Sequence, residues 1–241
     1  MPATPSSPPS SPSARRSGSR TGQGRKNVRG EATRRLILTA AERLFAEHGI
    51  AAVPLRDIGV AAGQRNHAAV QYHFGDRAEI VKSIIELRGA ESEVSRTHIV
   101  AELMLDPTPP TVRDVVDAFL RPLAIHLRPD NHYLAFLSMF ITEEGDYAGY
   151  DDVHAGASVL TLWALLDRLV PDLPKAVVEE RWWVIMTSGV HALARYQAAQ
   201  RKRSRLPAEI DVLIDDLVTF LSAGLTAPVT EGDPRAAAAA D

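Results

Sequence analysis

The chain has 241 residues, of which 45% are hydrophobic and 24% charged, a composition typical of globular proteins. It contains no cysteine, which excludes disulfides and thiolate chemistry, and no apolar run approaches the roughly 20 residues that a membrane-spanning helix needs. The net charge of −3 hides an asymmetry, because residues 1–88 hold 14 Lys and Arg against 7 Asp and Glu, whereas residues 89–241 hold 13 against 23. A nucleic-acid surface is therefore expected on the first part, and with no apolar signal segment at the N-terminus a cytoplasmic location is expected.

Residues 1–30 are rich in Ser, Pro and Gly and carry six basic residues but no acidic one. Such a composition buries too little apolar surface to offset the entropy of ordering, so it predicts a disordered arm. The arm would either follow DNA phosphates or enter the minor groove, as basic arms of other helix-turn-helix proteins do, or be an incidental tail.

Residues 33–49 predict an amphipathic helix. Its apolar residues fall on one helical stripe: Leu36, Ile37, Ala40, Ala41, Leu44 and Phe45. The opposite face, expected to meet water, carries Arg35, Glu42, Arg43 and Glu47. Gly49 is a natural left-handed cap at the C-terminal end.

Two short helices are predicted next. The first begins at Pro54, which a first helical turn tolerates, and Gly63 ends it. The second covers roughly residues 66–73, with Val70 and Phe74 as inward anchors four residues apart. Two short helices joined by a glycine-containing turn form a helix-turn-helix unit.

The outward face of that second helix is polar and free of acidic side chains. Arg pairs with guanine O6 and N7, Asn or Gln with adenine N6 and N7, and a small Ala leaves room for a thymine methyl group. The candidates for reading bases are Arg65, Asn66, His67, Ala68 and Gln71. The alternative is an ordinary solvated face.

These segments together resemble the DNA-binding domain of the TetR (tetracycline-repressor) family of bacterial regulators. In that family a helix of the type T-R-x-x-I-L-x-A-A-x-x-L-F-A-E-x-G leads to R-D-I-A-x-x-A-G and then to a recognition helix ending in Y-H-F; here these are residues 33–49, 56–63 and 72–74. Between the last two segments this chain has one residue more than the family's commonest spacing. The resemblance implies a base-edge or phosphate position for Gln71 and phosphate contacts from Thr33, Tyr72, His73 and Arg77.

The residues themselves also favour a phosphate near Arg77. Asp76 and Glu79 have the spacing of a capping box, so a helix should begin there with its amide groups exposed. A helix N-terminus beside an arginine attracts anions.

The rest of the chain predicts helices only, so the fold class is all-α. Helices are expected from Ile80 to about Met104, from a capped start at Thr111 with a kink at Pro122, over residues 131–143, and through Leu169. The predicted organisation is a helix-turn-helix DNA-binding domain over residues 31–78, a helical ligand-binding and dimerisation domain over residues 79–225, and a disordered tail over residues 226–241.

The last two predicted helices, residues 174–203 and 207–224, have unusually wide apolar faces. A helix with so wide an apolar face must be buried on two sides. The resemblance implies that these two helices form a four-helix dimer interface with those of a second subunit. The candidates are Trp182, Ile185, Gly189, Leu193, Ile210, Leu213, Leu217 and Leu221. The alternative is a pair of core helices in a monomer. A dimer would match a two-fold symmetric operator.

No catalytic motif is present, so an enzyme is not expected, and neither a cofactor nor a metal is predicted. Asp151 with His154, or His126 with His132, could be imagined as metal ligands, but isolated histidines are more often structural. A ligand pocket is the better candidate, with large apolar side chains and two histidines: Phe119, His126, Tyr133, Phe136, Met139, Phe140, Trp163, Met186 and His191. Any of them could equally be plain core.

The sequence thus predicts a homodimeric transcriptional regulator, most simply a repressor, that binds a palindromic double-stranded operator and responds to a small, largely apolar ligand. Two alternatives stay open: a sequence-indifferent DNA-binding protein that uses its basic arm, and a small-molecule carrier or enzyme built on the helical domain.

Overall fold

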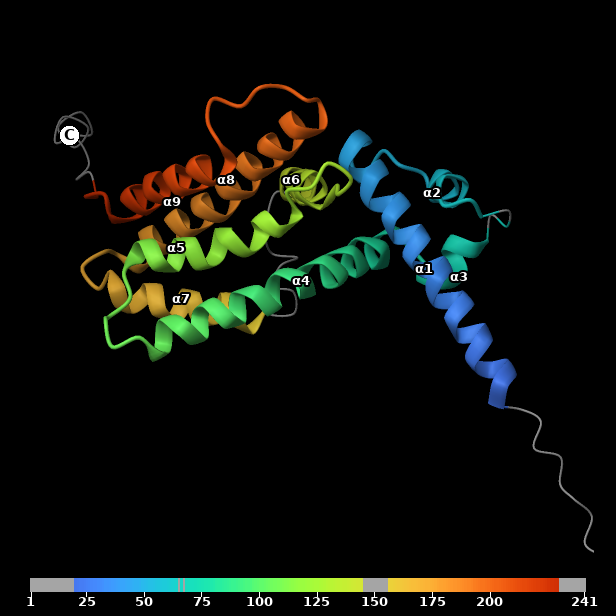
Figure 1. The fold of residues 1–241 in the computed structure, drawn as a ribbon, viewed down its shortest axis with the longest axis horizontal. Helices are drawn as coiled ribbons and strands as arrows, with labels where there is room; N and C mark the ends of the chain where they lie inside the picture. The colour runs from blue at the N-terminus through green and yellow to red at the C-terminus, as the bar shows by residue number, and fades with distance from the viewer. Residues whose placement is uncertain (1–19, 65, 67, 145–155, 230–241) are drawn as a thin grey trace, which may run out of the picture.

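A computed structural model describes residues 20–64, 66, 68–144 and 156–229, and every regular element within them is helical (Figure 1). The α-helices are α1 (Arg20–His48), α2 (Leu55–Ala61), α3 (Ala69–Phe74), α4 (Arg77–Leu105), α5 (Val112–Leu120), α6 (Tyr133–Glu144), α7 (Ala157–Leu169), α8 (Lys175–Arg201) and α9 (Ile210–Thr226). A 3₁₀ helix, η1, covers Arg121–His126. The predicted all-α class is confirmed.

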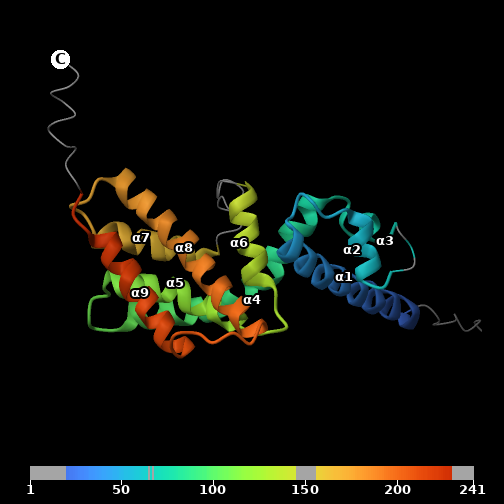
Figure 2. The same cartoon turned by 90° about the horizontal axis from the view of Figure 1, so that it is seen from above.

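The helices form two lobes. In Figures 1 and 2, α1, α2 and α3 make the smaller lobe, and α5 to α9, η1 and most of α4 make the larger one. Helix α4 extends from beside α3 into the larger lobe, so any change in its tilt moves one lobe against the other.

Several helix ends follow directly from local chemistry. The Asp76 side chain accepts a hydrogen bond from the Glu79 amide at the start of α4, as predicted. At the start of α5, Thr111 and Asp114 form a reciprocal capping box. Pro122 lies where α5 gives way to η1, because a proline lacks the amide that continues an α-helix.

Helix α1 begins earlier than the sequence predicted. It starts at Arg20, whereas residues up to 30 were expected to lack regular structure. Once packing has nucleated a helix, each further residue adds one hydrogen bond at low cost, so α1 continues outward past its packed part. Residues 1–19 and 230–241, the rest of the two segments predicted to be disordered, lie outside the described residues.

Two side chains of α1 face the opposite way from the prediction. Leu36 is 56% exposed, although it was assigned to the apolar stripe, and Glu42 is only 3% exposed, although it was assigned to water. The reason is that α1 packs against α4 and α6 of the larger lobe as well as against α2. The buried stripe therefore includes the side on which Glu42 lies.

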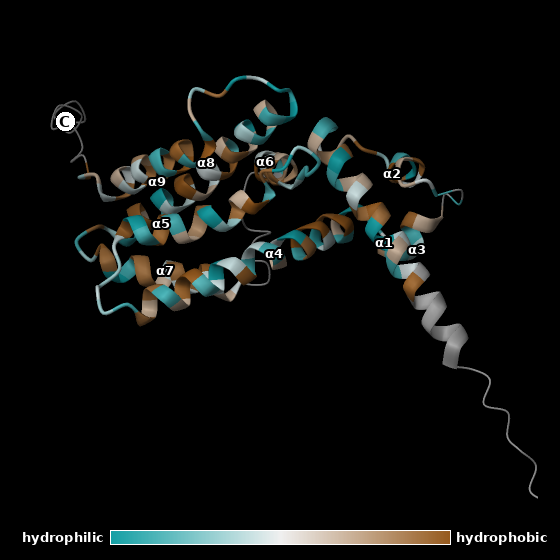
Figure 3. Ribbon diagram, viewed as in Figure 1, coloured by the Kyte–Doolittle hydropathy of each residue, from teal (hydrophilic) through white to brown (hydrophobic). Residues whose placement is uncertain are grey.

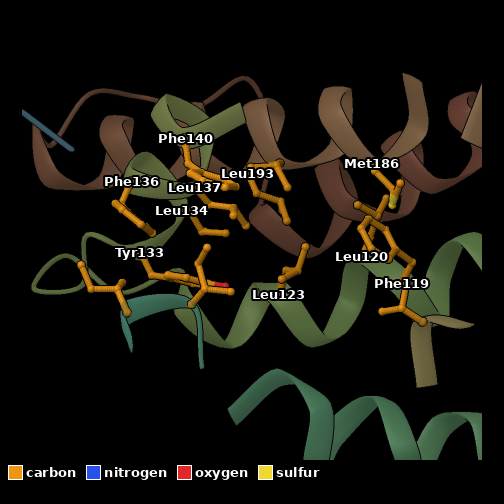
Figure 4. Close-up of a cluster of buried hydrophobic side chains, with 14 of the residues drawn as sticks. Phe119, Leu120, Leu123, Tyr133, Leu134, Phe136, Leu137, Phe140, Met186 and Leu193 are labelled. Atoms are coloured by element: carbon orange, nitrogen blue, oxygen red, sulfur yellow. The ribbon is translucent and has the colours of Figure 1, made fainter. Parts of the chain in front are cut away.

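The core of the larger lobe lies between α5, α6 and α8, where Leu120, Tyr133, Leu134 and Leu193 are almost fully buried (Figures 3 and 4). Gly189 of α8 lets these helices approach closely, because a Cβ there would lie 2.3 Å from Leu120 Cδ2. Gly189, a candidate for the dimer interface, thus lies against α5 of its own subunit.

Candidate functional site

Helix α3 presents a polar, acid-free surface outward. Val70 and Phe74 are 1% and 5% exposed and anchor its inner side, as predicted. Gln71 lies exposed on the outer side, and Tyr72 is 85% exposed. The short helix is thus oriented so that its outer side chains can reach another molecule.

Asn66 and Ala68 lie outside the helix, although they were predicted to be helical. The helix begins at Ala69, and the Asn66 side chain accepts a hydrogen bond from the Ala68 amide at 2.9 Å. Asn66 and Ala68 are both exposed. The predicted base-reading residues Arg65 and His67 lie outside the described residues.

Arg34 of α1 fixes the end of α3, a role that was not predicted. It donates to the His73 carbonyl at 3.2 Å and to Ser83 Oγ at 2.8 Å, and its guanidinium lies 4.4 Å from the centre of the Phe74 ring. Arg34 lies on the same helical stripe as the buried Ile37 and Leu38. An arginine on a buried stripe is the sequence feature that could have indicated this structural role. It connects α1, α3 and α4 at one point.

The residues predicted to contact phosphates differ in their burial and in their hydrogen bonds. His73 and Thr33 are half-buried, and Arg77, also half-buried, donates to the Val53 carbonyl at 2.9 Å. Arg77 therefore stabilises the loop before α2. Only the guanidinium N–H groups that do not bond Val53 are left to contact a phosphate.

Glu42 forms the main polar contact between the two lobes. Its carboxylate accepts from Arg88 Nε at 2.7 Å and Nη2 at 3.3 Å, and from the His132 amide at 3.0 Å. These donors come from α4 and from the segment just before α6. One buried carboxylate on α1 thus holds two elements of the larger lobe.

Helix α6 makes a second set of contacts, with the loop after α1 and with α1 itself. The Glu143 carboxylate accepts from the amides of Ile50 and Ala51, both at 2.8 Å. Phe136 stacks on Phe45 of α1, with ring centres 6.2 Å apart. Movement of α6 would therefore displace α1.

The larger lobe encloses a cavity of about 230 Å³ between α4, α5, η1, α6, α7 and α8. Most of its wall is apolar, and its polar residues come from α4 and α6: Glu86, Ser92, Glu93, Arg96 and Tyr133. Arg96 is 5% exposed, and its Nη1 pairs with Glu93 at 3.2 Å. A small, mainly apolar molecule with one polar end fits these properties.

Three of the predicted pocket residues line this cavity, and the other six do not. Phe119, Tyr133 and Met186 line it. Phe136 and Met139 lie on the α1 side of α6, and His191 is exposed and bonds within α8. The remaining predicted residues away from the wall are His126, Phe140 and Trp163. Periodicity identified buried side chains but could not show which of them border empty space.

A chain of hydrogen bonds leads from the cavity towards α1. Ser92 Oγ lies 3.0 Å from His126 Nε2, and Asn131 Nδ2 lies 3.4 Å from His126 Nδ1. Asn131 Oδ1 accepts from the Tyr133 amide at 2.8 Å, next to the His132 amide that Glu42 holds. Burial lowers the pKa of His126 to about 4, and the nearby Arg88 and Arg128 cations contribute to the shift.

The predicted dimer-interface residues of α8 face their own core, which corrects that prediction. Trp182, Ile185 and Leu193 are 5%, 2% and 0% exposed, and Gly189 packs on Leu120. On α9, Leu221 is likewise buried, and half-buried residues are found at Ile210, Leu213 and Leu217. The apolar side chains that do point outward are Val184, Val212 and Phe220, at 48%, 57% and 72% exposed.

The structure holds no group of three potential metal ligands among the residues it describes, and Asp151 and His154 lie outside them. In the described ranges, no helix has the length and apolarity to span a membrane.

Family models match both lobes of the chain. The family described as "Bacterial regulatory proteins, tetR family" matches residues 37–84, and "Tetracyclin repressor-like, C-terminal domain" matches residues 113–224. None of the curated proteins matches the chain.

Two solved structures are similar to this chain at low sequence identity, and the first of them shares the fold. A TetR family transcription regulator from Marinobacter aquaeolei VT8 is 15% identical, covers 81% of this chain and 96% of its own, and has a TM-score of 0.55. A TetR-family regulator from Streptomyces coelicolor A3 is 20% identical, covers 82% of this chain and 96% of its own, and has a TM-score of 0.38. Because the two family matches together span more than half of the sequence, one on each lobe, the chain belongs to the TetR family of DNA-binding transcriptional regulators.

Proposed function

We propose that the protein is a ligand-responsive repressor that binds a palindromic operator as a homodimer. The observation that carries this proposal is the outward, acid-free face of α3, held by the buried Val70 and Phe74 and by Arg34. A helix so held can enter a major groove without losing its own packing. A regulator of chromosomal DNA would act in the cytoplasm, and the proposal requires no catalytic reaction.

Base reading is assigned to the exposed residues around the start of α3. Gln71 has the chemistry to pair with adenine N6 and N7, Asn66 can do the same from the turn, and Ala68 leaves space for a thymine methyl. Arg65 and His67 belong to the same proposed surface by their position in the sequence.

Phosphate contacts are assigned to the borders of this surface. Tyr72 is exposed and His73 half-exposed at the end of α3, and Thr33 is next on α1 to Arg34, which donates to the His73 carbonyl. Arg77 is placed at the start of α4, where the helix N-terminus favours an anion. Such contacts fix the register on the duplex but do not read its sequence.

The dimer interface is assigned to the outward faces of α8 and α9. Val184, Val212 and Phe220 form the exposed apolar part, and half-buried Leu213 and Leu217 border it. A phenylalanine that is 72% exposed loses its contact with water if a second copy covers it. Two copies related by a two-fold axis would place two α3 helices for two operator half-sites.

Ligand response is assigned to the cavity and to its connections with α1. A ligand that binds better to the conformation with wrongly spaced α3 helices lowers operator affinity by that difference. The contacts of Glu42 and Glu143 support this route. Glu42 joins α1 to α4 and to the segment before α6, and Glu143 joins α6 to the loop after α1. Both α4 and α6 line the cavity.

Competition binding over a range of salt concentrations tests the proposal. The full chain should bind a duplex from its own upstream region about 10³-fold or more tightly than a scrambled duplex of equal length. One affinity for both duplexes would instead indicate a sequence-indifferent DNA-binding protein. Tight retention or turnover of a small molecule with no DNA binding would indicate a carrier or an enzyme.

A further inference from the structure

The volume of the cavity matches a small ligand. Its volume is about 230 Å³, and a cavity of about 150 Å³ in another protein holds one benzene molecule. A single ring with a short substituent therefore fills the space. Phe119, Leu123 and Leu137 supply apolar wall for the ring.

The polar network beside the cavity fixes the tautomer of His126. Asn131 Oδ1 accepts from the Tyr133 amide, so the Nδ2 amino group is the end that faces His126 Nδ1. An amino group donates, and His126 Nδ1 therefore accepts. Its lowered pKa keeps the ring neutral at pH 7, which leaves the single ring proton on Nε2.

That tautomer determines what Ser92 can offer a ligand. The assigned tautomer makes His126 Nε2 the donor to Ser92 Oγ, which lies 3.0 Å away, so the hydroxyl accepts this bond and retains its own proton. Among the described residues, Ser92 Oγ makes no other hydrogen bond, and Ser92 lines the cavity while being 2% exposed. Ser92 thus presents a donor to the cavity.

The charges in the wall argue against an ionised ligand. Glu93 and Arg96 neutralise each other, and the Glu93 carboxylate also accepts from the Ser158 amide and hydroxyl at 2.9 and 2.6 Å. Glu86 adds an exposed carboxylate, paired with Lys82 at 3.8 Å. Each of these three wall charges already has an opposite charge of the protein beside it, so an ionised ligand would lose its hydration without gaining a free counter-charge.

We propose that the cavity binds an uncharged, single-ring carbonyl compound whose oxygen accepts a hydrogen bond from the Ser92 hydroxyl. The inference rests on the proposed ligand-responsive function and adds the chemical class of the ligand. Because Ser92 is the cavity end of the hydrogen-bond chain through His126 and Asn131, the same contact connects ligand binding with the segment that Glu42 holds.

Calorimetric titration of the full chain with three probes of similar shape tests the class. Acetophenone supplies a carbonyl, α-methylstyrene replaces its oxygen with a methylene group, and benzoate is an anion. Acetophenone should bind about 2- to 10-fold more tightly than α-methylstyrene, the ratio expected for one hydrogen bond, and more tightly than benzoate. Ser92→Ala should reduce the ratio between the first two probes to about 1.

Ser222→Ala is the matched control, because this buried hydroxyl in α9 bonds only the Val218 carbonyl among the described residues and is not part of the cavity wall. It should leave the ratio unchanged. A ratio near 1 in the unmodified protein, a ratio that survives Ser92→Ala, tighter binding of benzoate, or no binding of any probe would each overturn the proposal.

Operator affinity measured with each probe separates this inference from the proposed function. A Ser92-dependent preference for acetophenone supports the assigned class even if operator affinity stays constant, and that constancy would count against ligand-responsive regulation. Operator release by a ligand that needs no Ser92 hydroxyl would keep the regulatory function and overturn the assigned class.

Discussion

Replacing Glu42 with glutamine tests whether one buried carboxylate holds the two lobes together. Glu42 accepts three hydrogen bonds, two from Arg88 and one from the His132 amide. Glutamine retains one oxygen, and its amino group would face a donor. The variant therefore leaves Arg88 without its closest counter-charge and at least one donor without an acceptor.

The expected cost follows from the burial of the pair. Breaking a fully buried ion pair costs about 3–5 kcal/mol. The Arg88 side chain is 20% exposed and also lies 3.4 Å from Glu91, so we expect a smaller loss of roughly 2–3 kcal/mol in the free energy of unfolding. Operator affinity should fall as well, because α1 loses a contact that sets its position.

Urea unfolding followed by circular dichroism, at one fixed protein concentration, measures this loss. Glu31→Gln is the control, since Glu31 is an exposed residue of the same helix whose pair with Arg35 should contribute less than about 0.5 kcal/mol. A cycle with Arg88→Met should give a coupling energy of about 1 kcal/mol or more. If Glu42→Gln were as stable as Glu31→Gln, the assigned role of Glu42 would be wrong.

Three other predictions concern DNA reading, assembly and pH. Gln71→Ala should weaken operator binding by roughly 1–3 kcal/mol while leaving scrambled duplex unaffected; equal losses in gel-shift titrations would show that Gln71 reads no base. Phe220→Glu should shift the protein from dimer to monomer in sedimentation velocity. Leu105→Glu should not, because Leu105 is 84% exposed on α4, outside the assigned interface; an intact Phe220→Glu dimer would refute that interface. His126 has a pKa of about 4 when folded and 6.5 when unfolded, so protonation favours unfolding, and its contribution is complete above pH 6.5 and lost as the pH falls towards 4. Between pH 7.5 and 5 this loss is about 2 kcal/mol, and His126→Gln should remove that part of the pH dependence; an unchanged dependence would contradict the burial of a neutral ring.

Features fixed by neighbouring residues could be predicted from the sequence. The inward anchors Val70 and Phe74 and the caps at Asp76 and Thr111 depend on side chains within four positions along the chain. The turn at Gly49 follows equally, since its φ of +88° is one that glycine adopts without strain.

Features fixed by distant packing could not be predicted in the same way. Glu42 looked like a solvent-facing residue of α1 because the pattern of one helix does not reveal that a second lobe covers it. The residues of α8 with the strongest apolar spacing are buried in their own subunit, which leaves weaker positions such as Phe220 and Val184 for a partner. A cavity is the space that the side chains of several helices leave empty. The sequence around Ser92, Glu93 and Arg96 therefore could not show that these residues line one.

Footprinting of the full chain on its flanking genomic DNA tests most directly whether α3 reads duplex DNA twice in a symmetric pair. Two protected half-sites related by inverted symmetry are predicted, with centres about 34–36 Å or a multiple apart, and Gln71→Ala should weaken both. Protection without any fixed sequence register, or a single protected half-site bound by one chain, would contradict the account.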